Sequence, residues 1–124
     1  MYLFPFEKLE VWQQAKKLSV LIYSETANFP KEELYGIVSQ IRRSVNSVSA
    51  NISEGTARIS GKEQARYTEI AYGSLMETVS HLEIAKALNF FDAKIVNQEI
   101  RPQIVHLANM LRKLRQYQLS INKK

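Results

Sequence analysis

The sequence contains no cysteine among its 124 residues, which excludes disulfide bonds and thiolate metal sites. Only 4 glycines and 3 prolines are present, so few positions interrupt regular secondary structure. No apolar run approaches the ~18 residues that a membrane-spanning helix needs, and no basic segment leads into an apolar stretch after Met1, as a secretory signal would require. We therefore expect one soluble, cytoplasmic domain with no membrane partner.

Groups that catalyse reactions are also scarce. The sequence has 2 histidines, His81 and His106, and lacks the His-Glu-x-x-His pattern of zinc enzymes. Glu77-x-x-x-His81 does not have the Glu-x-x-His spacing of di-iron bundles and has no second copy. Glycine-rich phosphate loops and the Gly-x-Ser-x-Gly nucleophile motif are absent as well. We expect no enzymatic activity, no metal and no cofactor.

Acidic residues are missing from the C-terminal part of the chain. The net charge is +5, and residues 1–101 hold 12 basic and 12 acidic residues, which cancel. The whole excess lies on Arg112, Lys113, Arg115, Lys123 and Lys124. Such a strip can attract phosphate or an acidic protein surface. It can equally be a solvated helix face that complements the negative end of a helix dipole.

Apolar residues recur at helical spacing along most of the chain. Four helices are predicted, over about residues 7–28, 31–57, 61–89 and 93–119. Phe29-Pro30, the capping box Ser60-Gly-Lys-Glu63, and Asp92 as an N-cap separate them. The predicted core positions are Val11, Ala15, Leu18, Ile22 and Phe29; Leu34, Val38, Ile41, Val45, Val48, Ile52 and Gly55; Tyr67, Ile70, Ala71, Leu75, Val79, Leu82, Ala85 and Leu88; and Val96, Ile100, Ile104, Leu107, Leu111, Leu114 and Ile121.

Long helices with short connections pack as antiparallel neighbours. The predicted fold is therefore an all-α, antiparallel up-down four-helix bundle. Pro102 falls inside the fourth helix, where it predicts either a kink near residues 98–102 or a short separate helix before it.

A polar stripe runs beside the apolar seam of the second helix. Its members share one face by their spacing of three or four residues: Gln40, Arg43, Ser47, Asn51, Glu54 and Arg58. The third helix carries a similar flank with Glu63, Arg66, Glu77 and His81. These stripes predict a hydrogen-bonded network between helices or subunits. The alternative is a solvated flank with local ion pairs.

Several small residues lie within the predicted helices, namely Gly36, Ala50, Gly55, Gly73 and Ser74. A glycine inside a helix costs about 0.5–1 kcal/mol relative to alanine. Close approach of a neighbouring helix would offset this cost, although the positions can also simply be tolerated.

Segments in a fixed order resemble a known bacterial family. They are Phe6-Glu-Lys-Leu-Glu-Val-Trp12, Phe29-Pro-Lys-Glu-Glu-Leu-Tyr-Gly36, Gln40-Ile-Arg-Arg-Ser-Val45, Asn51-Ile-Ser-Glu-Gly55 with Arg58, then Glu63, Tyr67, Ala71-Tyr-Gly-Ser74 and Glu77. This pattern is similar to that of the four-helix proteins encoded within intervening sequences of bacterial 23S ribosomal RNA genes. The fourth helix matches only in its apolar pattern.

The resemblance implies a bundle that assembles as a ring-like homopentamer. It also extends to the accessory proteins of diversity-generating retroelements, which are basic pentamers that bind a reverse transcriptase and nucleic acid. The residues that match the family motif become candidates for ordering assembly: Gln40, Arg43, Asn51, Glu54, Gly55, Arg58, Tyr67, Ser74 and Glu77.

The leading functional hypothesis is an oligomeric, weakly sequence-selective module that binds RNA or DNA. The candidate contacts are Arg112, Lys113, Arg115, Lys123 and Lys124, together with Lys16, Lys17 and Arg42. The alternative is a scaffold that holds a nucleic-acid-processing enzyme and has no nucleic-acid affinity of its own.

Overall fold

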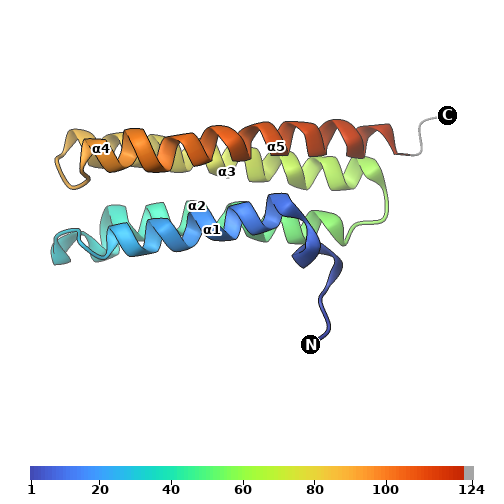
Figure 1. Ribbon diagram of the computed structural model, residues 1–124, viewed down its shortest axis with the longest axis horizontal. Helices are drawn as coiled ribbons and strands as arrows, with labels where there is room; N and C mark the ends of the chain where they lie inside the picture. The colour runs from blue at the N-terminus through green and yellow to red at the C-terminus, as the bar shows by residue number, and fades with distance from the viewer. Residues whose placement is uncertain (122–124) are drawn as a thin grey trace.

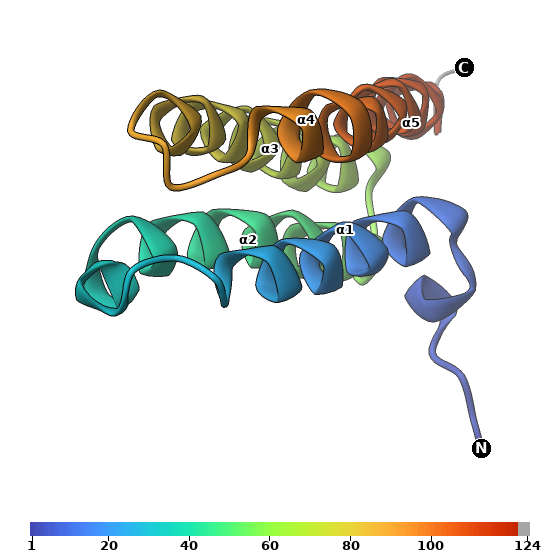
Figure 2. The same ribbon diagram turned by 60° about the vertical axis from the view of Figure 1, so that its left-hand side comes forward.

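Four long helices form an antiparallel bundle in the computed structural model, which describes residues 1–121 (Figure 1). They are α1 (Glu10–Thr26), α2 (Ser39–Thr56), α3 (Gly61–Ala87) and α5 (Arg101–Ser120), and no strand occurs within the described range. α2 packs on α1 and α3, and α5 packs on α3 and α1, so each helix touches two neighbours. Figure 2 shows the two hairpins, α1–α2 and α3–α5, lying one above the other. The predicted helical bundle is confirmed.

The heptad seam of α2 lies at the centre of the core. Val38, Ile41, Val45, Val48 and Ile52 are all buried. Facing them are large apolar side chains from the other three long helices: Leu18, Ile22, Leu75, Leu82, Leu107 and Leu111. Burying one such side chain contributes about 1.5–3 kcal/mol, so this seam is a major source of stability.

None of the helices in residues 1–121 is both long and apolar enough to cross a membrane.

Three residues predicted to be in the core lie at the surface. Leu34 is 45% exposed because it stands in a distorted turn before α2, where the heptad register does not apply. Ile70 is 43% exposed, since the neighbouring Ala71 takes the core position. Leu88 is 54% exposed because it caps α3 and no longer belongs to its buried face.

The first two helices begin later than the sequence predicted. A 3-10 turn, η1 (Pro5–Lys8), precedes α1. In place of a helix from residue 31, the chain forms a 3-10 turn, η2 (Lys31–Glu33), and a π turn, η3 (Leu34–Val38). Within η3, Gly36 has φ −111° and ψ −114°, which interrupts the helical path. The regular helix α2 therefore starts only at Ser39.

The fourth predicted helix changes its pitch ahead of Pro102. It starts as α4 (Ala93–Ile95), continues as the π turn η4 (Val96–Ile100), and becomes α5 at Arg101. Pro102 thus lies in the first turn of α5, where its missing N–H has the smallest cost. Val96 and Ile100 stay buried through this change, because a π turn shifts the register without ending the helix.

Local signals set the ends of α3 as predicted. The Ser60 hydroxyl accepts a hydrogen bond from the Glu63 N–H at 3.1 Å, and α3 begins at the next residue, Gly61. At the other end, Asn89 has φ 62° and donates its N–H to the Lys86 carbonyl, while Phe90 donates to the Ala85 carbonyl. This pair of bonds is a Schellman motif, which satisfies the last carbonyls of the helix.

Two of the glycines predicted to allow close helix approach behave differently. A Cβ placed on Gly55 of α2 would lie 2.8 Å from the Cβ of Tyr67 and 3.3 Å from the Gln64 carbonyl oxygen, both on α3. Gly73 of α3 is exposed, and a Cβ there would meet nothing within 4 Å. The close-approach prediction therefore holds at Gly55 and is wrong for Gly73 within this chain.

This difference provides a matched pair of substitutions. Gly55→Ala should destabilise the protein by about 1–3 kcal/mol, because the added methyl group pushes α3 away. Gly73→Ala should stabilise it by about 0.4–1 kcal/mol, because alanine reduces the freedom of the unfolded chain and fits the open site. Urea unfolding followed by circular dichroism measures both free energies. Equal effects of the two substitutions would contradict the close contact at Gly55.

Candidate functional site

The family-motif residues meet along the contact between α2 and α3. At its middle, the hydroxyls of Ser47 and Ser74 lie 2.8 Å apart, one on each helix. The Asn51 side-chain amide donates to the Ser47 carbonyl at 2.8 Å and to its hydroxyl at 3.0 Å. All three side chains are half-buried. The polar stripe of α2 is thus connected to α3 within one chain.

An ion pair closes one end of this contact. Arg43 of α2 pairs with the carboxylate of Glu77 of α3 and donates to the Gln40 side-chain oxygen at 3.1 Å. The His81 Nε2 lies 3.1 Å from the same Glu77 carboxylate. The hydrogen bond with His81 lowers the pKa of Glu77, desolvation opposes this shift, and Arg43 lowers the pKa further. The carboxylate is therefore favoured in its charged form.

An arginine and a tyrosine close the other end. The Arg58 guanidinium lies 4.7 Å from the ring centroid of Tyr67 and donates to its hydroxyl at 2.6 Å. The Gln64 side chain donates to the Arg58 carbonyl at 2.8 Å. Tyr67 also touches Gly55, so the arginine holds the ring over the closest point between the helices.

Glu54 is separate from this network. Its side chain is exposed, and no hydrogen bond or ion pair to it occurs among residues 1–121. It lines a shallow surface hollow with Phe4, Pro5 and Phe6. Gln40 and Arg43 of α2 are also exposed, but unlike Glu54 they take part in the hydrogen bonds and the ion pair at the α2–α3 contact.

Four buried polar side chains that pair between helices were not predicted from the sequence. Thr78 donates to the Ser44 hydroxyl at 2.9 Å in the core between α2 and α3, and Thr68 donates to the Gln118 side-chain oxygen at 2.6 Å between α3 and α5. All four residues are buried. The one feature of the sequence that could have indicated these pairs is the placement of the four polar residues at inward-facing helical positions, near Ile41, Leu75 and Leu111.

The basic candidates have different environments. Arg42 is half-buried: it lies 4.5 Å from the ring centroid of Tyr23 and donates to the Thr26 hydroxyl at 3.0 Å. Lys16 lies 5.6 Å from the Trp12 ring centroid. Lys17 and Lys113 are exposed, with no ion pair to another described residue. Lys123 and Lys124 lie outside the described residues. The structure therefore ties Arg42 into the bundle and leaves Lys16, Lys17 and Lys113 at its surface.

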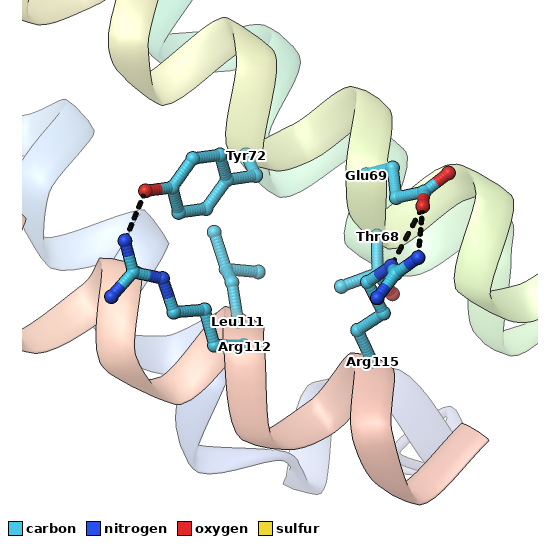
Figure 3. A pocket seen from close by; sticks show the side chains of 6 residues that line it. All are labelled: Thr68, Glu69, Tyr72, Leu111, Arg112 and Arg115. Atoms are coloured by element: carbon cyan, nitrogen blue, oxygen red, sulfur yellow. Dashed lines mark hydrogen bonds and ion pairs between the residues drawn. The ribbon is translucent and has the colours of Figure 1, made fainter. Parts of the chain in front are cut away.

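Arg112 and Arg115 of α5 lie on opposite sides of a pocket of about 320 Å³ between α3 and α5 (Figure 3). The Arg112 guanidinium is 5.4 Å from the Tyr72 ring centroid and donates to its hydroxyl at 2.8 Å. Arg115 donates to one Glu69 oxygen from Nε at 2.7 Å and from a terminal nitrogen at 2.6 Å. Leu111 and Thr68 complete the lining. We call this the α3–α5 pocket.

The described residues contain no group of three or more histidine and acidic side chains placed to hold a metal ion. The side chains at both sites make hydrogen bonds, ring contacts and ion pairs. Arginine is well suited to all three, because its planar guanidinium binds phosphate and stacks on flat rings.

Comparisons with known proteins agree with the fold. The model of the family described as 23S rRNA-intervening sequence protein matches residues 7–113. A crystal structure from Bacteroides thetaiotaomicron, of a protein of unknown function from the S23 ribosomal protein family, superposes with a TM-score of 0.63 at 21% sequence identity. The superposition covers 92% of this chain and 99% of the other. Among curated proteins, none matches the sequence.

The Glu77 cluster predicts a pH-dependent contribution to stability. Because folding lowers the pKa of Glu77 from 4.5, the ionised carboxylate stabilises the protein above pH 4.5, and this contribution disappears as pH falls through the folded-state value. Glu77→Gln should therefore lower the free energy of unfolding at pH 7 and have a smaller effect near pH 3. Urea unfolding at both values measures the difference. A Glu77→Gln penalty that does not change with pH would contradict the ion pair.

Proposed function

Because the chain belongs to the 23S rRNA-intervening sequence protein family, we propose that it is a non-enzymatic, self-associating protein that binds RNA or DNA with little sequence selectivity. The observation that carries the proposal is the excess of positive charge on α5, where only Arg115 of the three cations below forms an ion pair among the described residues, with Glu69 of α3. From Pro102 to Ser120 this helix has three cations, Arg112, Lys113 and Arg115, and no acidic residue. All three cations are exposed.

Clustered positive charge favours nucleic acid through phosphate contacts. Each neutralised phosphate releases counterions, which strengthens binding at low salt. Such contacts position the protein on the nucleic acid but do not distinguish one base sequence from another. In a homopentamer, as the family resemblance implies, five chains of +5 would carry about +25. Assembly would therefore raise the local density of positive charge and strengthen the attraction of phosphate.

Two exposed helix faces support self-association. One lies on α3 and its C-cap and contains the exposed, uncharged residues Ile70, Gly73, Ser80, Ile84 and Leu88, with Arg66 and Glu77 in the same arc. The other lies on α2 and its C-cap and contains the exposed Ser39, Asn46, Ala50 and Ala57 together with the half-buried Ser53, which are all small or uncharged. Each set falls within about 80° on its helix at 100° per residue. Large apolar side chains on one face and small ones on another suit packing between copies.

The same faces also fit a second function. A scaffold for a nucleic-acid-processing enzyme would use the exposed apolar residues of α3, such as Ile70, Ile84 and Leu88, to hold its partner. It would need no nucleic-acid affinity of its own. Capture from lysate with and without nuclease treatment separates the two functions, because only a direct protein partner survives the nuclease.

Salt dependence tests the nucleic-acid function. Two single-stranded oligonucleotides of unrelated sequence should bind with similar affinity, and the logarithm of the affinity should fall linearly with the logarithm of salt concentration, with a slope of about 0.7 per phosphate contacted. Fluorescence anisotropy between about 50 and 200 mM salt measures this. Binding that ignores salt, or strongly prefers one sequence, would contradict the proposal.

Substitutions in the family motif test self-association. Asn51→Ala or Glu54→Ala should reduce the mass measured by light scattering toward that of one chain. The first removes the amide that holds Ser47 in the α2–α3 contact, and the second removes an exposed charge beside it. Glu99→Ala, which removes an exposed acid that lies in none of the family segments, serves as the control. If all three variants keep the wild-type mass, the assembly role of the motif is wrong.

A further inference from the structure

The α3–α5 pocket combines charged walls with an apolar base. In Figure 3, Tyr72 and Arg112 stand on one side, Glu69 and Arg115 stand on the other, and Leu111 lies between them. Leu111 is buried, and the Thr68 hydroxyl is already donated to Gln118 and to the Gln64 carbonyl. Leu111 is only 1% exposed and closes the base of the pocket, so the half-buried ring of Tyr72 is the apolar surface that a flat ligand can reach.

Both arginines keep donors for a ligand. A guanidinium has five N–H donors, and within the described residues Arg112 uses one of them, on the Tyr72 hydroxyl. Arg115 directs two of its nitrogens at Glu69 in a pair whose side chains are 45% and 52% exposed. An ion pair as exposed as this contributes little to stability. A phosphate can therefore compete with the Glu69 carboxylate for Arg115.

We propose that the α3–α5 pocket binds one unstacked nucleotide, with the base against the ring of Tyr72 and the phosphate between Arg112 and Arg115. This inference rests on the proposed nucleic-acid function and specifies where a single strand binds. Flat rings and guanidinium planes are the groups on which unstacked bases pack. A volume of about 320 Å³ is near the lower limit for small-ligand sites, which suits a single nucleotide. The nucleotide can come from a strand or from a free mononucleotide.

Two pairs of variants test the site. Arg112→Gln should weaken binding of an oligo-dT strand about tenfold, whereas Lys113→Gln, which makes the same charge change one residue away and outside the pocket, should weaken it only two- to threefold. Glu69→Gln should strengthen binding several-fold by releasing Arg115. Glu63→Gln, on the same helix but away from both arginines, should have a smaller effect. Fluorescence anisotropy at fixed salt gives the affinities, and circular dichroism verifies that each variant is folded.

Free ligands identify what the pocket recognises. Thymidine 5′-monophosphate should bind more tightly than inorganic phosphate, as measured by calorimetry, and Arg112→Gln should abolish the difference. Equal binding of the two would overturn the role of the base. Cross-linking of a 5-iodouracil strand should modify Tyr72, and modification confined to other residues would also overturn the site.

The outcomes separate this site from the broader function. If the wild-type protein binds the strand but Arg112→Gln and Lys113→Gln act alike, or Glu69→Gln weakens binding, the pocket is wrong while nucleic-acid binding stands. If the protein binds the mononucleotide in an Arg112-dependent way but not the strand, the proposed function is wrong and the pocket stands. If it binds neither, both are wrong.

Discussion

The close contact between α2 and α3 is the constraint on which the rest of the bundle depends. At Gly55 the two helices approach so closely that no side chain fits between them, and Tyr67 covers the contact. Further along the same contact, Ser47 meets Ser74 and Arg43 meets Glu77. Because these three contacts are spread along the length of the pair, α2 and α3 cannot slide or rotate relative to each other. The direction in which the apolar seam of α2 faces the core is fixed as a result.

Buried polar pairs add specificity that apolar packing lacks. Leu and Ile side chains can interdigitate in more than one register, because hydrophobic attraction is not directional. The Thr78–Ser44 and Thr68–Gln118 pairs each cross a helix interface inside the core. A one-residue shift would break both pairs; the three hydroxyls would keep hydrogen bonds to carbonyls of their own helices, but the buried Gln118 side-chain oxygen would lose its partner, at a cost of about 1–3 kcal/mol. The two pairs therefore define which residues of α3 face α2 and α5.

The sequence predicted the fold well where local and periodic signals agreed. The Val38–Ile52 seam, the Ser60 cap and the Asp92 cap needed only spacing and residue type. The π turns at Gly36 and before Pro102 were not predictable in the same way. A π turn depends on how the flanking segments pack, and it leaves the apolar pattern almost unchanged. The candidate site was predictable as a set of residues on one helix face. Which partner each one meets, as with Arg43 and Glu77, depends on the rotation of two helices about each other.

Three arginine–tyrosine pairs show why charge counting alone cannot locate a binding surface. Arg42 is half-buried and hydrogen-bonded to α1, and Arg58 holds Tyr67 over Gly55, so each of these cations stabilises a helix contact. Arg112 makes a similar contact with Tyr72, yet its pair borders an open pocket that a second arginine also lines. A cation already enclosed by its own chain loses packing when a ligand displaces it. A cation at the rim of a pocket can keep its ring and still bind an anion. Under the proposed function, Arg112 and Arg115 of α5, and not Arg42 or Arg58, are therefore the arginines through which positive charge would contact a partner.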